Sequence, residues 1–150
     1  MNNKPSVYLD DLVVGETFIS GKHQLNQEQI VDFATQYDPQ PFHLDPQAAE
    51  STPFRGLAAS GWHTTAITMR LLVDSLPISD GIIGTGAEIE WPRPTRPSDC
   101  LQVTTKVVDI RHSRSKPDRG IVTLECLTKN QSDEICQRMV TKVFVMRRPV

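Results

Sequence analysis

Residues 62–75 read WHTTAITMRLLVDS and are the most apolar stretch of the chain with helical spacing. A helix is therefore predicted from Trp62 to about Ser75. Its apolar side chains spread around most of the helix circumference: Ala66, Ile67, Met69, Leu71, Leu72 and Val73. A helix that is apolar on most sides is usually enclosed by other elements. We expect the rest of the fold to surround this segment.

The chain that follows this helix changes its hydrophobic period from 3.6 to 2. This alternation predicts four long strands, over Gly84–Trp91, Leu101–His112, Ile121–Gln131 and Ile135–Arg147. Turn-forming residues separate the strands, and Asn130–Asp133 predicts a tight hairpin. Successive strands with short connections favour antiparallel pairing. One enclosed helix and an antiparallel sheet indicate an α+β fold.

The chain that precedes the central helix predicts one more strand and two shorter helices. The strand spans Thr17–Leu25 and is interrupted by Gly21. Asn26 is a good N-cap for the next helix, and Gln29 can complete a capping box. One face of this helix is expected to be buried, and its residues are Ile30, Phe33, Ala34 and Tyr37.

Proline residues determine the local structure after that helix. Asp38 precedes a proline, which ends the helix, and residues 38–43 are expected to form a stiff turn. Asp45 and Pro46 then suit the N-cap and first position of a second short helix, which we expect to reach about Ser51.

Composition limits the function classes. The 150 residues hold 16 Lys and Arg against 18 Asp and Glu, a net charge of −2, which disfavours nucleic acid as a partner. Hydrophobic residues make up 38%, enough for one core. The longest apolar runs fall far short of the ~20 residues that span a bilayer, so no membrane association is expected. Residues 1–150 are therefore expected to form a single domain.

The amino-terminal residues and the cysteines indicate the compartment. Residues 1–6 contain no apolar segment of the kind found in signal peptides. The cysteines, Cys100, Cys126 and Cys136, are widely spaced and form no Cys-x-x-Cys pair, so small buried thiols are expected. These features favour a cytoplasmic protein.

Asp38 and His43 are the first candidate catalytic residues. They lie five positions apart across Pro39 and Pro41, which restrict the backbone between them. A carboxylate and an imidazole held at a fixed separation are suited to general acid–base catalysis. The alternative is that Asp38 only ends a helix and His43 is a buried polar side chain bonded to the backbone.

The segment from Tyr37 to Asp45 resembles the hydratase motif of the MaoC-like, (R)-specific enoyl-CoA hydratase family. That motif runs Asp-x-Asn-Pro-aliphatic-His, and an Asp-Pro helix start follows it. The matching residues here are Asp38-Pro39-Gln40-Pro41-Phe42-His43, then Asp45-Pro46. The resemblance covers about residues 10–148. It implies a single MaoC-like hot-dog domain over residues 1–150, with a curled antiparallel sheet wrapped around one long central helix.

The resemblance also implies roles for site residues. In the family, the Asp and His hold the water that adds to the double bond, and a helix-start glycine 18 residues after the His offers its N–H to the thioester oxygen. Here these residues are Asp38, His43 and Gly61. The family's Asn is Gln40, which keeps an amide, and the common His before the glycine is Ser60. We include both in the substrate-binding site.

Gly61 has a physical argument of its own. Attack on carbon 3 of an enoyl thioester develops negative charge on the carbonyl oxygen, and the free N–H groups of a helix start can receive it. The alternative is a plain helix-start glycine. Alanine forms helices better than glycine, so Gly61→Ala is expected to keep or slightly raise stability while lowering activity.

The implied function is reversible hydration of a 2-enoyl thioester, from enoyl-CoA to (R)-3-hydroxyacyl-CoA. The expected partners are an acyl-CoA or acyl-carrier thioester and a second copy of the chain, as a homodimer or dimer of dimers. No cofactor is implied. Two alternatives stay open: a thioesterase on the same fold, and a non-catalytic acyl-thioester-binding subunit, for which the departure at Gln40 is the hint.

The remaining candidates have weaker signals. His63 is expected to pack in the core, and His23 and His112 to be structural or exposed. No third and fourth ligands cluster near His43 and Asp45, so no metal is expected.

The substrate contacts beyond the motif are also open. The basic segment Arg111–Gly120 could meet coenzyme A phosphates or simply be a solvated hairpin loop. An apolar acyl slot is expected around Phe42, Trp62 and Met69, although these residues suit a core equally well.

Overall fold

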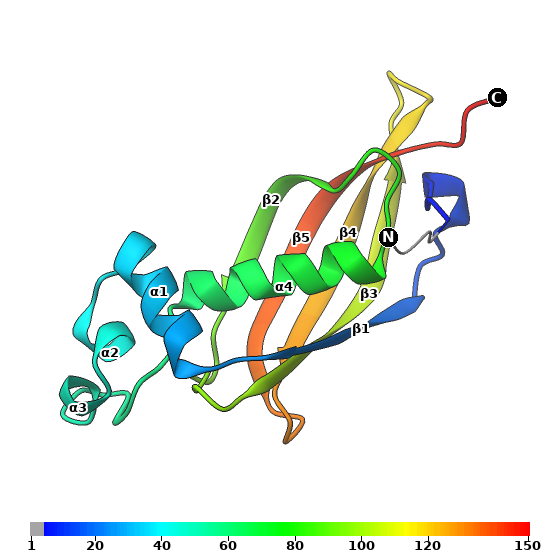
Figure 1. Ribbon diagram of the computed structural model, residues 1–150. Helices are drawn as coiled ribbons and strands as arrows, with labels where there is room; N and C mark the ends of the chain where they lie inside the picture. The colour runs from blue at the N-terminus through cyan, green and yellow to red at the C-terminus, as the bar shows by residue number, and fades with distance from the viewer. Residues whose placement is uncertain (1–4) are drawn as a thin grey trace.

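The computed structural model describes residues 5–150 (Figure 1). Its helices are η1 (Leu9–Asp11), α1 (Gln27–Tyr37), α2 (Pro41–Leu44), α3 (Pro46–Ala49) and α4 (Gly61–Ser75). Its strands are β1 (Thr17–Gln24), β2 (Ile83–Glu90), β3 (Cys100–His112), β4 (Arg119–Lys129) and β5 (Ile135–Met146). Across the described residues, no helix is long and apolar enough to cross a membrane. The expectation of no signal peptide concerns residues 1–6, of which 1–4 lie outside the described range.

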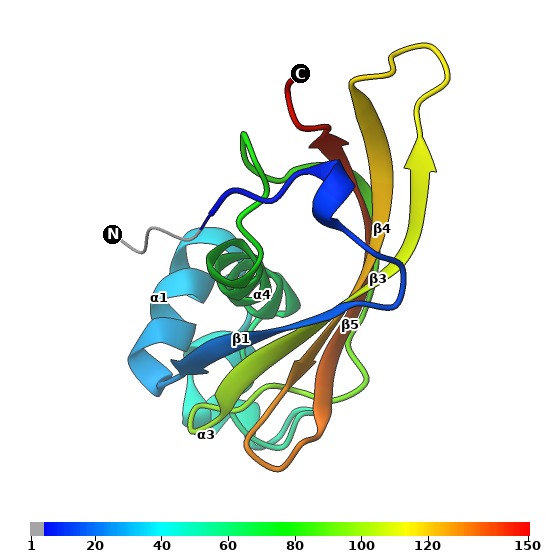
Figure 2. The same ribbon diagram turned by 90° about the vertical axis from the view of Figure 1, so that its right-hand side faces the viewer.

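The five strands form one antiparallel sheet in the order β1-β3-β4-β5-β2. Figure 2 shows the sheet curling around α4. Strand β4 alternates strictly between buried and half-buried side chains, as a strand with one face on a core does. β1 carries a register shift between Ile19 and Lys22, at the predicted interruption. The predicted α+β hot-dog arrangement is confirmed.

Helix α4 packs one face against the concave side of the sheet. Ile67, Leu71 and Leu72 on that face are at most 7% exposed and belong to the main core. Met69 and Val73 on the opposite face are 39% and 45% exposed. The expectation that α4 is enclosed on most sides is therefore wrong for a single chain, because one sheet covers only one side of a helix.

The structure differs from the sequence prediction mainly at the end of α1 and in the proline-containing segment that follows it. Asn26 caps α1 as expected, with its side chain accepting from the Gln29 N–H, but Tyr37 is 71% exposed. Tyr37 occupies the last turn, which extends beyond the core. Residues 41–44 form one helical turn, and α3 ends at Ala49, short of the predicted end at Ser51.

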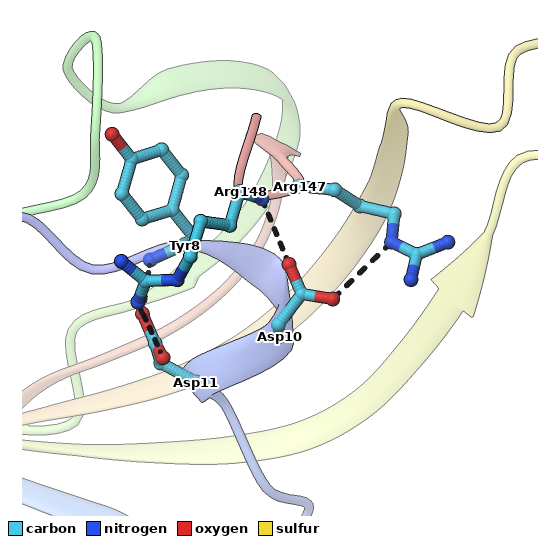
Figure 3. Close-up of polar contacts among 5 residues, drawn as sticks. All are labelled: Tyr8, Asp10, Asp11, Arg147 and Arg148. Carbon is cyan, nitrogen blue, oxygen red and sulfur yellow. Dashed lines mark hydrogen bonds and ion pairs between the residues drawn. The ribbon is translucent and has the colours of Figure 1, made fainter. Parts of the chain in front are cut away.

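The two ends of the described chain are tied together by charged side chains (Figure 3). Asp10 accepts hydrogen bonds from the Arg148 backbone N–H at 2.8 Å and from Arg147 Nε at 3.2 Å. Arg148 also pairs with Asp11, at 2.6 Å, and stacks over the Tyr8 ring. The backbone hydrogen bond from Arg148 is the main cause of a lowered pKa at Asp10. This cluster holds η1 against the end of β5.

Candidate active site

A cavity of about 300 Å³, here called the α4 pocket, lies at the amino-terminal end of α4. Figure 1 shows α1, α2 and the first turn of α4 meeting at this end of the molecule. The segment that follows β2 completes the wall. The lining residues are Asp38, His43, Phe54, Ala59, Gly61, Trp62, Thr64, Trp91, Arg93, Pro94 and Thr95. The structure therefore brings Gly61 together with Asp38 and His43, which precede it by 23 and 18 residues in the sequence.

His43 is held in one orientation by the backbone. It lies on the single turn of α2, which begins at Pro41, and is 4% exposed. Its Nδ1 lies 2.6 Å from the carbonyl oxygen of Ala58. A carbonyl oxygen only accepts, so Nδ1 must carry a proton, and in the neutral tautomer that fits this bond Nε2 is the acceptor. Nε2 lies 3.3 Å from Oδ2 of Asp38.

Asp38 follows α1 directly, and donors surround its carboxylate. Oδ1 accepts from Nε2 of Gln40 at 2.5 Å, and Oδ2 accepts from Oγ of Ser60 at 2.7 Å. Burial raises the pKa of Asp38, but these two hydrogen bonds and the nearby His43 outweigh it and lower the pKa overall. The side chain is therefore an anion at neutral pH. Ser60 caps no backbone group of α4 because its hydroxyl is used here.

Gly61 is the first residue of α4 and lines the pocket, so the helix begins at the pocket wall. Within residues 5–150 its backbone N–H has no acceptor, as is usual for the first turn of a helix. A methyl group on Gly61 would stand 2.7 Å from Cε2 of Trp91, closer than side-chain carbons approach. We therefore replace the expectation that Gly61→Ala preserves stability by the opposite one, because the Trp91 ring would have to move to admit a Cβ.

Trp91 is held by a polar network around the buried Gln137, which the sequence did not reveal. Its Nε1 donates to Oε1 of Gln137 at 2.8 Å, and Gln137 is fully buried. Thr65 donates to the same oxygen at 2.8 Å, and Gln137 Nε2 donates to Thr68 at 3.2 Å. Both threonines lie on α4. This network joins β5 to α4 and sets the position of the Trp91 wall.

Of the three residues expected around an apolar acyl slot, only Trp62 lines the α4 pocket. Trp62 meets Trp91 edge-on, with ring centroids 5.6 Å apart. Phe42 instead packs against the His43 ring, and Met69 lies two turns further along α4, outside the lining. Pocket residues that sequence reasoning missed include Trp91 and Arg93. Nothing in local periodicity marks them, because a loop places them there.

His23, His63 and His112 are not among the residues that line the α4 pocket. His63 is 8% exposed, stacks on Phe33 with ring centroids 4.6 Å apart, and its Nδ1 has no partner among the described residues. Burial lowers the pKa of His63 to about 4. His23 bonds to Gln29, and His112 is an exposed residue at the end of β3. Residues 5–150 contain no group of three or more His, Cys, Asp or Glu arranged as metal ligands.

The basic segment Arg111–Gly120 forms the β3–β4 hairpin, and most of its side chains are exposed. The hairpin projects from the end of the sheet opposite α2 and α3 (Figures 1 and 2). Within one chain it is therefore far from the α4 pocket. This placement favours the solvated-loop interpretation over contact with a thioester bound in the same protomer.

Comparisons with known proteins agree with this geometry. A crystal structure of a MaoC-like dehydratase from Rhodospirillum rubrum is 54% identical, with a TM-score of 0.95 over 97% of this chain and 100% of that one. The uncharacterised protein YdeM of Bacillus subtilis is 31% identical over 83% of this chain and 89% of its own. A 3-hydroxybutyryl-CoA dehydratase of Methylorubrum extorquens is 29% identical, over 86% and 78%.

The family comparison covers both the site and most of the sheet. Residues 12–130 match the model of the MaoC like domain. That range includes Asp38 and His43, the start of α4 and four of the five strands. The chain therefore belongs to the MaoC-like domain family.

Proposed function

We propose that this protein is a hydratase/dehydratase that adds water reversibly to a 2-enoyl thioester, converting enoyl-CoA to (R)-3-hydroxyacyl-CoA. One observation carries the proposal: His43 Nε2 and the Asp38 carboxylate lie 3.3 Å apart in the cavity that also receives the start of α4. Family membership and the similarity to a 3-hydroxybutyryl-CoA dehydratase support the same reaction class.

In the proposed mechanism the pair binds and activates the water. Nε2 of His43 accepts one water proton, and the anionic Asp38 accepts a hydrogen bond from the same water. The hydroxyl oxygen adds to carbon 3, and the pair returns the proton to carbon 2. One water molecule thus supplies both the hydroxyl group at carbon 3 and the proton at carbon 2. Asp38 also stabilises the positive charge that develops on the His43 ring.

Gly61 is proposed to stabilise the enolate. Addition at carbon 3 moves an electron pair onto the thioester oxygen, which then accepts from the Gly61 N–H at the positive end of the α4 dipole. The missing Cβ lets the thioester come close to the backbone. Gln40 and Ser60 serve this site by holding the Asp38 carboxylate rather than by touching the reacting carbons.

The deciding experiment offers a panel of 2-enoyl-CoA esters to the pure protein. Loss of the conjugated absorbance and release of free thiol are followed in parallel. Hydration without thiol release, giving an (R)-3-hydroxyacyl-CoA, is the expected result. Thiol release would instead identify a thioesterase, and binding without either reaction would identify a non-catalytic subunit.

We further propose a cytoplasmic homodimer that forms along β2. This strand is a sheet edge with almost every side chain exposed, including Ile83 at 54%. A sheet edge presents unpaired backbone N–H and C=O groups, which are a template for pairing with another strand. Free thiols at Cys100, Cys126 and Cys136 suit a reducing compartment. Light scattering tests the dimer: a dimeric mass is expected, and a monomeric mass at micromolar concentration would contradict it.

A further inference from the structure

The α4 pocket contains one permanently cationic side chain. Arg93 is the only arginine or lysine among the residues that line this cavity in the described part of the chain. Its Nη2 lies 2.8 Å from Oε2 of Glu134, in the turn between β4 and β5. The two side chains are 51% and 38% exposed. Arg93 thus lies at the cavity wall, and its guanidinium is held by a carboxylate that solvent can reach.

This ion pair contributes little to the fold. Exposed pairs of this kind add little to stability because water screens the charges and two flexible side chains must be ordered. Glu134 also has a second contact, since its Oε1 accepts from Asn130 at 3.2 Å. A different carboxylate or phosphate could therefore replace Glu134 at Arg93 without disturbing the turn.

The charges that line the cavity indicate what Arg93 could bind. Asp38 places a negative charge in the same cavity, which repels any anionic group on an incoming molecule. A guanidinium offsets this repulsion and binds carboxylates or phosphates through two parallel N–H donors. A neutral, apolar acyl chain would gain nothing from such a group.

We propose that Arg93 binds an anionic oxygen group of the thioester substrate in exchange for Glu134. The inference rests on the proposed function in that it places the thioester in the α4 pocket. Two sources share this chemistry: a carboxylate on the acyl group and a phosphate on the carrier. The small cavity that Arg93 shares with Asp38 and His43 favours the acyl carboxylate, because the pantetheine arm separates the phosphates from the thioester.

Equilibrium binding of saturated thioesters tests the proposal. Pentanoyl and glutaryl esters have the same chain length and differ in the terminal carboxylate. Each is measured by calorimetry both as the CoA ester and as the phosphate-free pantetheine ester. Saturated esters have no double bond to hydrate, so the result stands even if hydratase activity is absent.

Arg93→Gln is expected to weaken binding roughly tenfold, because it removes hydrogen bonds between charged groups. Weakening of both glutaryl esters alone assigns the acyl carboxylate. Weakening of both CoA esters with unchanged pantetheine esters assigns the phosphate. Equal affinity of wild type and Arg93→Gln for all four esters would overturn the proposal, as would failure of the wild type to bind any of them.

Glu134→Gln is expected to strengthen the binding that Arg93→Gln weakens. It releases Arg93 from its competing carboxylate, so anionic esters should bind about two- to fivefold more tightly, the equivalent of one exposed ion pair. Arg70→Gln is the matched control, because Arg70 forms an exposed pair with Asp74 on α4 outside the pocket lining. Arg70→Gln should leave all affinities unchanged. Weaker binding of anionic esters by Glu134→Gln would overturn the inference.

Discussion

The indole ring of Trp91 lies against Gly61 so closely that an added methyl group would stand 2.7 Å from Cε2 and 2.9 Å from Cζ2. The residue after β2 thus covers the residue that begins α4. The contact links the shape of the pocket to the packing of the fold, since Trp91 is itself bonded to the buried Gln137.

Gly61→Ala should therefore lower both stability and activity. Overpacking costs roughly 1–3 kcal/mol, and displacement of an oxyanion donor costs up to about 10²–10³ in kcat. Urea unfolding and the hydration assay measure the two effects. Gly21→Ala is the control, because a Cβ at that position would meet no atom within 4 Å beyond its own chain neighbours.

A second substitution separates steric strain from backbone conformation. In a Trp91→Ala background, Gly61→Ala should recover most of its lost stability, because the ring that it would strike is gone. A double-mutant cycle in urea measures this coupling. Independent, additive effects would show that Trp91 does not cause the destabilisation.

Ser60→Ala should raise the pKa of Asp38, because it removes a hydrogen bond that favours the ionised carboxylate. The acidic limb of the profile of kcat/KM against pH should move to higher pH. Ser75→Ala is a matched control, since the hydroxyl of that last residue of α4 bonds only to backbone carbonyls of the helix. An unmoved acidic limb in Ser60→Ala would mean that Asp38 ionisation does not control the rate.

His63 should make stability depend on pH. Its pKa is about 4 when folded and 6.5 when exposed, so the unfolded chain takes up the proton first. The free energy of unfolding should fall by up to about 3 kcal/mol between pH 6.5 and pH 4. His63→Phe, which keeps a ring against Phe33, should remove this loss. Equal slopes in that range for both proteins would refute the assignment.

Chelation should leave activity intact, because the proposed mechanism assigns water activation to His43 and Asp38 rather than to a metal-bound water. The hydration rate is measured before and after prolonged treatment with EDTA. A loss that a divalent cation restores would contradict the mechanism.

Sequence patterns predicted the strands and the helices α1, α3 and α4, but not η1 or α2 and not the packing partners. The strand alternation located β3 and β5 to within a residue, because one buried face imposes period 2 on the sequence. The same reasoning failed for Tyr37 and for the outer face of α4. Apolar character indicates which side chains suit a core, whereas the extent of the sheet decides which ones are covered.

The candidate site divides in the same way. Asp38 and His43 could be predicted from the sequence, because they lie five residues apart within a recognisable motif that contains two prolines. Trp91 and Arg93 could not, because the segment after β2 brings them to the pocket. Trp91 meets Trp62 of α4 there, and Arg93 pairs with Glu134 in the turn between β4 and β5. The role of Ser60 also required the structure, since its partner Asp38 lies 22 residues away.

The most direct test of the central claim is kcat for enoyl-CoA hydration by wild type, Asp38→Asn and His43→Ala, with folding checked by urea unfolding. Acid–base groups contribute about 10²–10⁴ in rate. The account predicts that each folded variant loses at least a factor of about 10², and that the double variant loses less than the product, because the pair acts as a unit. Near wild-type turnover by folded His43→Ala would contradict it.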